Sequence, residues 1–523
     1  MNKEVEFILQ RLHDAGYEAY MVGGCVRDKL MNRNIHDYDI CTSALPQEVE
    51  NVFEEYRIIE TGLKHGTVTV VLEDDSYEIT TFRADGDYSD GRHPDSVSFV
   101  RNIRDDLLRR DFTMNAIAFD GENYVDMFGG AEDIHNKTIR CVGNANERFQ
   151  EDALRILRAM RFSSQLGFVI EDETKKAMHE NRNLIQKVSN ERIAMELQKM
   201  IVGDNIYDVL HEFRDIVAII IPEFERCFDF DQKNDWHVYD IYEHIIHSVQ
   251  NIDADKILRL AMLFHDIGKP KAFIEDANGV GHFYGHNKHS KKLCQDIMHR
   301  LKFDNDTIEK VAVLVEHHDR EIAETKKSIR KLFSQIGADA SLNLLKVKCA
   351  DNLAQNRNKI AESGVLDHIY TVRTIMDDVL NSDDCTDKKH LAITGNDLKE
   401  LGFEPSPLYS IIFKDILERV MEDELANNKD ELLGYIRTHY IFKVIANVEV
   451  CEYGKRNFEK IGTNMDDMEF DVWQDIEKFC IDLKMPIGTT VHIGIEFYEL
   501  DMKIDFCDAV YSYNGKNPVL VEV

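Results

Sequence analysis

From about residue 147 to residue 440, this chain repeats its apolar side chains with the period of an α-helix. Both ends differ from this long middle. Residues 1–125 combine short helical patterns with alternating strands at 66–72 and 77–82. Residues 441–523 contain a helix-like stretch at 470–483, a strand-like stretch at 490–498 and a hairpin signal at Asn514-Gly515 before 518–523. The sequence therefore predicts an α+β domain, a mainly α-helical region and a small α+β appendage.

A glycine pair and an Asp-x-Asp motif stand close together near the amino end. Gly23 and Gly24 let backbone N–H groups approach a polyphosphate. Because alternate residues of a strand face the same side, we expect Asp37 and Asp39 to point into one site. Two converging carboxylates favour a cation between them, and hard oxygen ligands favour Mg²⁺ carrying substrate phosphates. The pattern is typical of two-metal phosphoryl transfer.

Further polar residues complete this first candidate site. Glu78, on the following strand, is the candidate third carboxylate. The residues expected to bind triphosphate and ribose offer backbone N–H groups, guanidinium groups, carboxylates or a side-chain amide: Gly23, Gly24, Arg27, Asp28, Arg109, Arg110, Asp111 and Asn115. Each pattern by itself also fits a solvated turn or a basic surface turn, so the interpretation depends on their combination.

Six motifs follow one another over residues 1–200: GGCVRD with DYD, TTFRADGDYSDGRHP, RRDFTMNAIA, EDALRILRAMRF and NERIAMEL. This set resembles the class II tRNA nucleotidyltransferase and bacterial poly(A) polymerase superfamily. The resemblance implies a polymerase-β-like palm, a helical neck that holds the incoming nucleotide, and helical body and tail domains that hold tRNA. RRDFTMNAIA is more similar to the CCA-adding branch. A poly(A) or A-only adding enzyme remains the alternative. An enzyme that adds only C, C or only A would carry nearly the same motifs, and the features that separate it from a full CCA-adding enzyme lie around residues 84–100.

The EDxxR motif suggests how bases are chosen without a template. Asp152 and Arg155 lie three apart on an expected long helix, so their side chains should share a face. A carboxylate acceptor and a guanidinium donor match the amino donor and ring-nitrogen acceptor that cytosine and adenine share. Such a pair is otherwise usually a surface ion pair. The family motif implies that these two residues read the base, while Arg158 and Arg161 contact phosphate or the neck.

A second set of histidines and acids lies further along the chain: His244, His265, Asp266, His286, His317, His318 and Asp351. Imidazoles and carboxylates on separate helices form a mixed shell for Mn²⁺, Ni²⁺, Fe²⁺ or Mg²⁺. Such a metal generates hydroxide and polarises a phosphoryl oxygen, although a lone histidine is usually structural. The ordered set resembles the HD phosphohydrolase superfamily, which implies His244, His265, Asp266 and Asp351 as core ligands. The others are additional or second-metal candidates, and neighbours on a helix point about 100° apart.

The composition limits how RNA is bound. A formal charge of −33 and a pI near 5.0 argue against nonspecific coating of nucleic acid. RNA must then meet a local basic strip, for which 175–182 or Lys346, Lys348 and Arg357 are candidates, although scattered surface charge is the favoured explanation for each. The ten cysteines form no CxxC pair and are read as reduced thiols. Without a leader or a membrane-length apolar run, we expect a soluble, cytoplasmic protein that needs no membrane.

These observations give one overall hypothesis. We expect a nucleotidyltransferase palm at 1–146, a neck at 147–225, an HD domain at 226–360, a helical tail at 361–440 and an appendage with a partner-binding or regulatory role at 441–523. The expected activity is CCA addition to tRNA from CTP and ATP with Mg²⁺, together with phosphohydrolase activity supported by a transition metal or Mg²⁺. The alternative from another class is a hydrolase with a non-catalytic, nucleotide-binding amino half. The oligomeric state and the hydrolase substrate stay open, with 2′,3′-cyclic phosphates, 2′-nucleotides or pyrophosphate as options.

Overall fold

The computed structural model describes residues 2–35, 37–62, 66–73, 75–85, 97–382, 386–403, 405–440, 442–450, 454–462, 465–482, 490–499, 502–513 and 520–522. The chain divides into two compact units, Met1–Glu321 with Leu342–Ile369, and Ile322–Ser341 with Tyr370–Val523. The five domains expected from the sequence are finer than this division and stay predictions.

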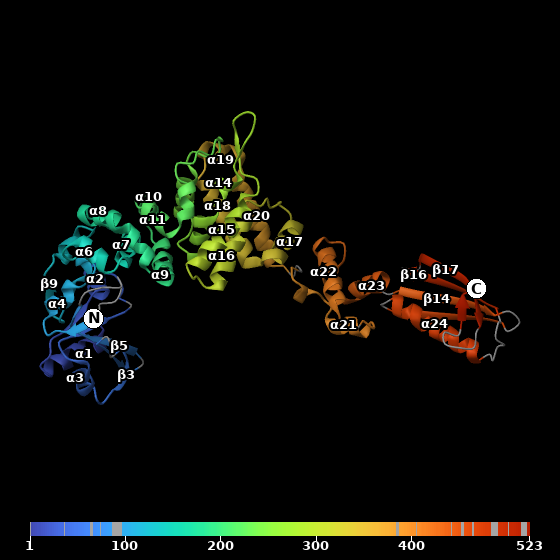
Figure 1. The fold of residues 1–523 in the computed structure, drawn as a ribbon, viewed down its shortest axis with the longest axis horizontal. Coiled ribbons are helices and arrows are strands. Elements are labelled where there is room, and N and C mark those ends of the chain that lie inside the picture. Colours follow the sequence, from blue (N-terminus) through green and yellow to red (C-terminus); the bar gives the residue numbers. More distant parts are fainter. Residues whose placement is uncertain are drawn as a thin grey trace. The chain divides into compact units, whose positions relative to one another are not determined.

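A mixed seven-stranded sheet is the centre of the amino-terminal region (Figure 1), with the order β3-β4-β5-β2-β1-β8-β9. Its strands are β1 (Ala19–Val22), β2 (Asp39–Thr42), β3 (Arg57–Gly62), β4 (Thr67–Leu72), β5 (Asp75–Thr81), β8 (Ile117–Phe119) and β9 (Tyr124–Asp126). Only β2 and β5 pair in parallel, and every other neighbouring pair is antiparallel. The expected strands at 66–72 and 77–82 are confirmed as β4 and β5.

Amphipathic patterns explain how this sheet is covered. Along β4, Val68, Val70 and Leu72 are buried while the residues between them are partly exposed. The helices of this region are α1 (Lys3–Asp14), α2 (Gly24–Leu30), α3 (Pro46–Val52), α4 (Ile103–Leu108) and α5 (Gly130–His135), and a separate two-stranded ladder joins β6 (Arg83–Asp85) to β7 (Val97–Phe99). The expected mixed sheet with flanking helices is therefore confirmed.

The middle of the chain is helical, as the period of its apolar residues predicts. Its helices are α6 (Ala145–Glu151), α7 (Leu154–Leu166), α8 (Asp172–Asn181), α9 (Asn190–Ile201), α10 (Ile206–Glu212), α11 (Arg214–Ile220), α12 (Ile241–Gln250), α13 (Lys256–Phe264), α14 (Lys269–Ala272), α15 (His286–Arg300), α16 (Asn305–His317), α17 (Lys326–Ile336), α18 (Ala338–Leu353), α19 (Arg357–Ser363), α20 (Val365–Leu380), α21 (Gly395–Glu400), α22 (Pro407–Met421) and α23 (Lys429–His439). Short ladders join β10 (Thr138–Ile139) to β11 (Val169–Ile170) and β12 (Ile274–Glu275) to β13 (Gly281–His282).

The carboxyl-terminal appendage is α+β, as expected. It contains β14 (Phe442–Val450), β15 (Gly454–Gly462), α24 (Met465–Asp482), β16 (Thr490–Glu499), β17 (Met502–Tyr513) and β18 (Leu520–Glu522). Its antiparallel sheet has the order β15-β14-β16-β17-β18. The expected turn Asn514-Gly515 lies outside the described residues, and the strands on either side of it, β17 and β18, form an antiparallel pair.

Two expectations from composition bear on the fold. Within the described ranges, no helix has both the length and the apolar character to cross a bilayer. Five of the described cysteines are buried free thiols, and Cys349 is a partly buried one.

Candidate functional site

The acids of the palm gather at the start of β2. Asp39 is the first residue of β2, whereas Asp37 lies just before the strand, so the expectation that both belong to one strand is wrong. Glu78 is the register partner of Asp39 on the parallel strand β5, which places both side chains on one face of the sheet. We call Asp37, Asp39 and Glu78 the acidic site.

The electrostatics of the acidic site suit a cation. Asp39 is an exposed residue, but desolvation of its carboxylate by the surrounding protein raises its pKa. The positive charge of Arg110 opposes this shift, whereas the negative charges of Glu78 and Asp37 raise the pKa of Asp39 further. A divalent ion would relieve this repulsion of the like charges around Asp39. Among the described residues, the groups of three whose ligand atoms all lie within 4.8 Å belong to the histidine-rich site below, so the ligand atoms of the three palm acids are spaced more widely than that.

Two adjacent arginines are fixed beside the acidic site by one buried acid. The carboxylate of Asp106, on α4, accepts a hydrogen bond from Arg109 Nη2 at 2.7 Å and another from Arg110 Nη2 at 3.2 Å. Burial opposes the ionisation of Asp106, but the two guanidinium groups hold its pKa below the usual value. Asp106 was not among the residues picked from the sequence. Its signal is an acid three and four residues before the arginine pair, which is the spacing of neighbours on a helix.

Gly23 makes room for this arrangement. Its φ of +76° is a conformation that residues with a side chain rarely adopt. A Cβ on Gly23 would lie 3.1 Å from Arg110 Nη1 and 3.4 Å from Asp39 Oδ2. The glycine therefore lets the turn before α2 pass close to both charged groups.

The other predicted nucleotide-binding residues form a chain of hydrogen bonds behind the acidic site. Arg27 donates to Asn115 Oδ1 at 3.0 Å and to Asp28 Oδ1 at 2.9 Å. Asn115 Nδ2 donates to Asp111 Oδ1 at 3.2 Å, and Arg158 Nε donates to Asp111 Oδ2 at 2.7 Å. Burial alone would raise the pKa of Asp111, but Arg158 and the hydrogen bonds lower it to about 2.

These hydrogen bonds connect the sheet-containing region with the helices that follow it, because Arg158 lies on α7. Two more arginines make the same junction: Arg155 Nη2 donates to Arg109 O at 3.0 Å, and Arg148 Nη1 donates to Leu108 O at 3.2 Å. Arg161 pairs instead with the buried Glu196 at 3.2 Å, within the neck.

The expectation that one long helix carries both Asp152 and Arg155 is wrong. α6 ends at Glu151, Asp152 is extended at φ −145° and ψ 103°, and α7 begins at Leu154. The Asp152 carboxylate accepts from Leu154 N at 3.0 Å and from Arg192 Nη2 at 2.7 Å, because an aspartate in a helix break caps the following backbone. Arg155 is instead buried and pairs with Glu151 at 2.5 Å.

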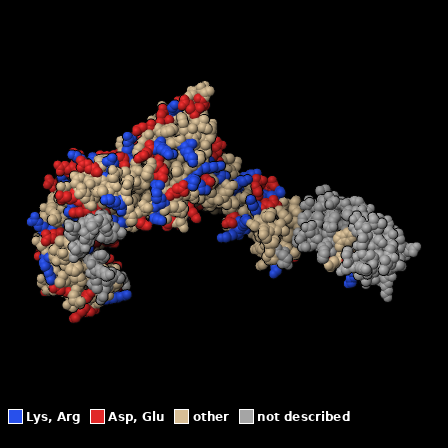
Figure 2. Space-filling model, viewed as in Figure 1, with Lys and Arg blue, Asp and Glu red and all other residues tan. Residues whose placement is uncertain are grey.

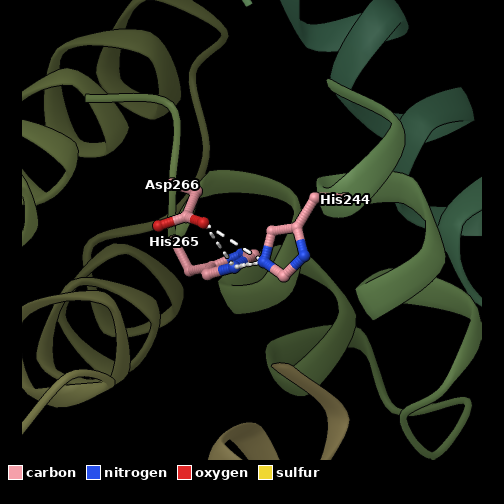
Figure 3. Close-up of side chains that lie close together, drawn as sticks. All are labelled: His244, His265 and Asp266. Carbon is pink, nitrogen blue, oxygen red and sulfur yellow. Dashed lines mark hydrogen bonds and ion pairs between the residues drawn. The ribbon is translucent and has the colours of Figure 1, made fainter. Parts of the chain in front are cut away.

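The second set of residues converges from five places in the helical region. His244 lies on α12, the pair His265-Asp266 follows α13, His286 begins α15, His318 follows α16 and Asp351 lies on α18. We call these six residues the His/Asp cluster. Figure 3 shows His244 and His265 pointing toward the Asp266 carboxylate. Their Nε2 atoms lie 3.2 and 3.3 Å from Asp266 Oδ2, and His244 Nε2 lies 3.0 Å from Asp351 Oδ1.

Two ligand groups share Asp266. The first consists of His244, His265 and Asp266, and the second of Asp266, His286 and His318. Oδ2 faces the first pair of imidazoles, whereas Oδ1 lies 3.3 Å from His286 Nε2 and 3.6 Å from His318 Nε2. The imidazoles on both sides of Asp266, together with its two oxygens, would be the residues that hold divalent metal at this site.

The far side of each imidazole identifies its tautomer. Nδ1 of each histidine lies against a backbone carbonyl, at 3.3 Å for His244, 2.7 Å for His265, and 2.8 Å for both His286 and His318. A carbonyl only accepts, so each neutral ring carries its proton on Nδ1 and turns the Nε2 lone pair toward Asp266. This is the tautomer that metal-binding histidines adopt.

Asp266 has the environment of a ligand without its ion. It is 1% exposed, and neither oxygen receives a well-directed hydrogen bond from a described residue. Lys269 Nζ lies 2.6 Å from Oδ2, and it is among the charges that lower the pKa of Asp266 against the effect of burial. Lone pairs that face a carboxylate repel it unless a cation lies between them, so the residues present fit a divalent metal.

His317 does not join the cluster. Its Nε2 lies 4.0 Å from Glu316, and neither ligand group includes it, so its place among the metal ligands is corrected. Its neighbour His318 is the one that points inward, because successive helical residues diverge by about 100°. A cavity of about 300 Å³ reaches the cluster at Asp266, His286, His318 and Asp351.

The basic strips proposed from the sequence are largely paired with acids. Lys175 contacts Glu212, Arg182 contacts Asp215 and Lys346 contacts Asp253. Figure 2 shows acidic and basic side chains intermingled on the visible surface. The binding of RNA by a local basic strip therefore stays a prediction.

Three family models match the chain. One described as "Poly A polymerase head domain" matches residues 19–140, one described as "Probable RNA and SrmB- binding site of polymerase A" matches 167–227, and one described as "tRNA nucleotidyltransferase domain 2 putative" matches 282–436. The first covers the acidic site, and the last covers His286, His318 and Asp351.

Curated relatives match part of the sequence of this chain. CCA-adding enzymes of Enterococcus faecalis and Lactobacillus johnsonii are 50% identical over 204 residues and 54% identical over 194 residues, which are 39% and 37% of this chain. These matches cover 50% and 48% of the relatives, so the chain spans about half the length of the curated relatives it matches.

Solved structures extend the likeness. The Bacillus stearothermophilus CCA-adding enzyme in complex with CTP has a TM-score of 0.61 and 29% identity, covering 83% of this chain and 98% of its own. The Thermotoga maritima CCA-adding enzyme complexed with tRNA has a TM-score of 0.50 at 17% identity, covering 83% and 94%, and shares the fold.

Proposed function

We propose that this chain, which resembles CCA-adding enzymes in its family-model matches, its curated relatives and its fold, adds C, C and A to tRNA 3′ ends from CTP and ATP. The observation that carries this proposal is the acidic site, where Asp39 and Glu78 pair across parallel strands beside Arg110. The proposal places the enzyme in the cytoplasm, where tRNA is processed.

Each group of the palm has a role in this reaction. Asp37 and Asp39 would hold Mg²⁺, with Glu78 as the third carboxylate, and the ion would activate the 3′ hydroxyl and neutralise the departing pyrophosphate. Arg109 and Arg110, fixed by Asp106, supply the nearest cationic donors for a triphosphate. Arg27 and Asp28 on α2, together with Asn115, which accepts a hydrogen bond from Arg27, would contact the ribose and phosphates next to the turn at Gly23 and Gly24.

Base choice is proposed for Asp152 and Arg155. In the structure Arg192 forms an ion pair with Asp152, and Glu151 forms one with Arg155. To bind the edge of cytosine or adenine, Arg155 would therefore break its ion pair with Glu151 and donate to the base instead. Asp152 would need only one carboxylate oxygen to accept from the base and could keep its ion pair with Arg192 through the other. Such an exchange favours bases that replace every lost hydrogen bond, and it leaves buried groups unpaired with uracil or guanine.

An incorporation assay tests this function. tRNA lacking its CCA end is incubated with the purified chain and one labelled nucleoside triphosphate at a time. We expect incorporation of C first, of A only after C, and none of G or U. Long A tracts from ATP alone would indicate the poly(A) alternative, and A added only to tRNA that already ends in CC would indicate the A-only alternative.

The His/Asp cluster favours a second activity, a metal-dependent phosphohydrolase. Four Nε2 lone pairs surround a buried carboxylate that lacks well-directed hydrogen bonds, and a cavity reaches the cluster. A divalent ion there would supply a hydroxide and polarise a phosphoryl oxygen. The test is phosphate release from 2′,3′-cyclic phosphates, 2′-nucleotides and pyrophosphate. Release that requires Mn²⁺ or Ni²⁺ and disappears in Asp266→Asn would support this activity. The same release from Asp266→Asn as from the wild type would refute it.

A further inference from the structure

Two stacked rings line the cavity that reaches the His/Asp cluster. His282 and Tyr284 have ring centroids 5.4 Å apart and planes inclined by only 7°. Both line the same cavity of about 300 Å³ as Asp266, His286 and His318. Tyr284 is 74% exposed, so most of its ring surface is available to a ligand.

The short segment that carries these rings holds them in place. His282 ends β13, its Nε2 lies 3.2 Å from Asp276 Oδ2, and its Nδ1 lies 3.4 Å from Tyr284 Oη. Gly285, at φ +73°, then turns the chain into α15, whose first residue is His286. The ring pair is therefore tied within a few residues to a candidate metal ligand.

A stacked, exposed aromatic near a phosphate-binding metal suits one class of ligand. Every nucleobase has a π-face that stacks on tyrosine, and the stack contributes without selecting one base. Gln355 and Asp319 line the same cavity with groups that can bond a ribose or a base edge. Sugar phosphates or inorganic pyrophosphate would leave the ring pair without a partner.

We propose that Tyr284, supported by His282, is the stacking platform for the base of a nucleoside phosphate whose phosphate lies over the His/Asp cluster. This inference rests on the proposed phosphohydrolase function and names its substrate class. The base belongs either to a free nucleotide or to the terminal nucleotide of an RNA, because both present the same chemistry.

The test compares substrates with and without a base on the full chain loaded with Mn²⁺. Phosphate release is followed from adenosine 3′-monophosphate, from an RNA oligonucleotide ending in a 3′-phosphate, and from ribose 5-phosphate. We expect Tyr284→Ala to raise KM for the base-carrying substrates by about tenfold, and Tyr284→Phe to restore it. An effect limited to the mononucleotide or to the oligonucleotide identifies the source of the base. Tyr370→Ala is the matched control, because Tyr370 is 75% exposed on α20.

Direct binding separates this inference from the activity on which it rests. Calorimetric titration of the Mn²⁺-loaded variants with adenosine 3′-monophosphate needs no turnover, and we expect Tyr284→Ala to bind about tenfold more weakly than Tyr370→Ala. Equal affinities would overturn the platform even if phosphate is released. A tenfold loss of affinity without any phosphate release would keep the platform and exclude hydrolysis of 3′-phosphates at this site instead.

Discussion

Asp39, the first residue of β2, is the register partner of Glu78 on the parallel strand β5, and the charge of Glu78 raises the pKa of Asp39. Glu78→Gln should therefore slow nucleotide incorporation by about tenfold or more through kcat. It should also shift the acid limb of the pH–rate profile to lower pH, because removing a negative charge lowers the pKa of Asp39. Asp75→Asn, at the other end of β5, is the control. An unshifted profile would exclude Glu78 from the acidic site.

Arg192 holds the Asp152 carboxylate with a hydrogen bond of 2.7 Å. If Asp152 accepts from the base, Arg192→Met should loosen that acceptor and lower the discrimination of CTP over UTP by about tenfold. The measurement is the ratio of kcat/KM values for single-nucleotide addition. Arg182→Met, which removes a more exposed contact with Asp215, should leave the ratio unchanged. Unaltered selectivity in Arg192→Met would argue against Asp152 as a base reader.

Neighbouring histidines provide a matched pair for the His/Asp cluster. His318 Nε2 lies 3.0 Å from His286 Nε2, whereas His317 points to Glu316. His318→Gln should weaken Mn²⁺ binding by about tenfold or more, and His317→Gln should leave it within about twofold of the wild type. Calorimetric titration of protein treated with a chelator measures both. Equal losses in the two variants would contradict the orientation of the pair.

Arg158 and Asp111 form a partly buried pair whose contribution to stability depends on pH. In the folded protein the pKa of Asp111 is about 2 rather than 3.8. A lowered pKa stabilises the fold above pH 3.8, and this stabilisation is lost as the pH falls toward 2. Arg158→Met should therefore cost about 3 kcal/mol at pH 7 and much less near pH 2.

Unfolding in urea across this pH range measures the difference between the two proteins. The exposed pair Lys176–Glu180 gives the control, because Lys176→Met should cost about 0.5 kcal/mol or less. A cost for Arg158→Met that does not change with pH would show that lost packing, rather than the pairing with Asp111, explains it.

Local patterns in the sequence predicted much of the fold. The alternation in β4 and β5 and the helical period of the middle both appear in the structure, because burial of one face determines each pattern. The order of the histidines and acids also predicted a metal cluster, and the structure brings His244, His265, Asp266, His286, His318 and Asp351 together.

Local sequence patterns could not predict which side chains contact each other when they lie far apart in the sequence. The helix break at Asp152 depends on its contact with Arg192, forty positions later. The choice of His318 over His317 depends on the rotation of α16. Both are tertiary arrangements, and neither spacing nor composition encodes them locally. Asp106 differs, because its spacing before Arg109 and Arg110 is a local signal that the sequence does contain.

The most direct test of the transferase assignment compares Asp39→Ala with Asp266→Asn on tRNA lacking its CCA end. If the acidic site transfers nucleotides, Asp39→Ala loses incorporation of labelled CMP and AMP by about a thousandfold or more, while Asp266→Asn retains it. Incorporation by Asp39→Ala at the wild-type rate would contradict the account.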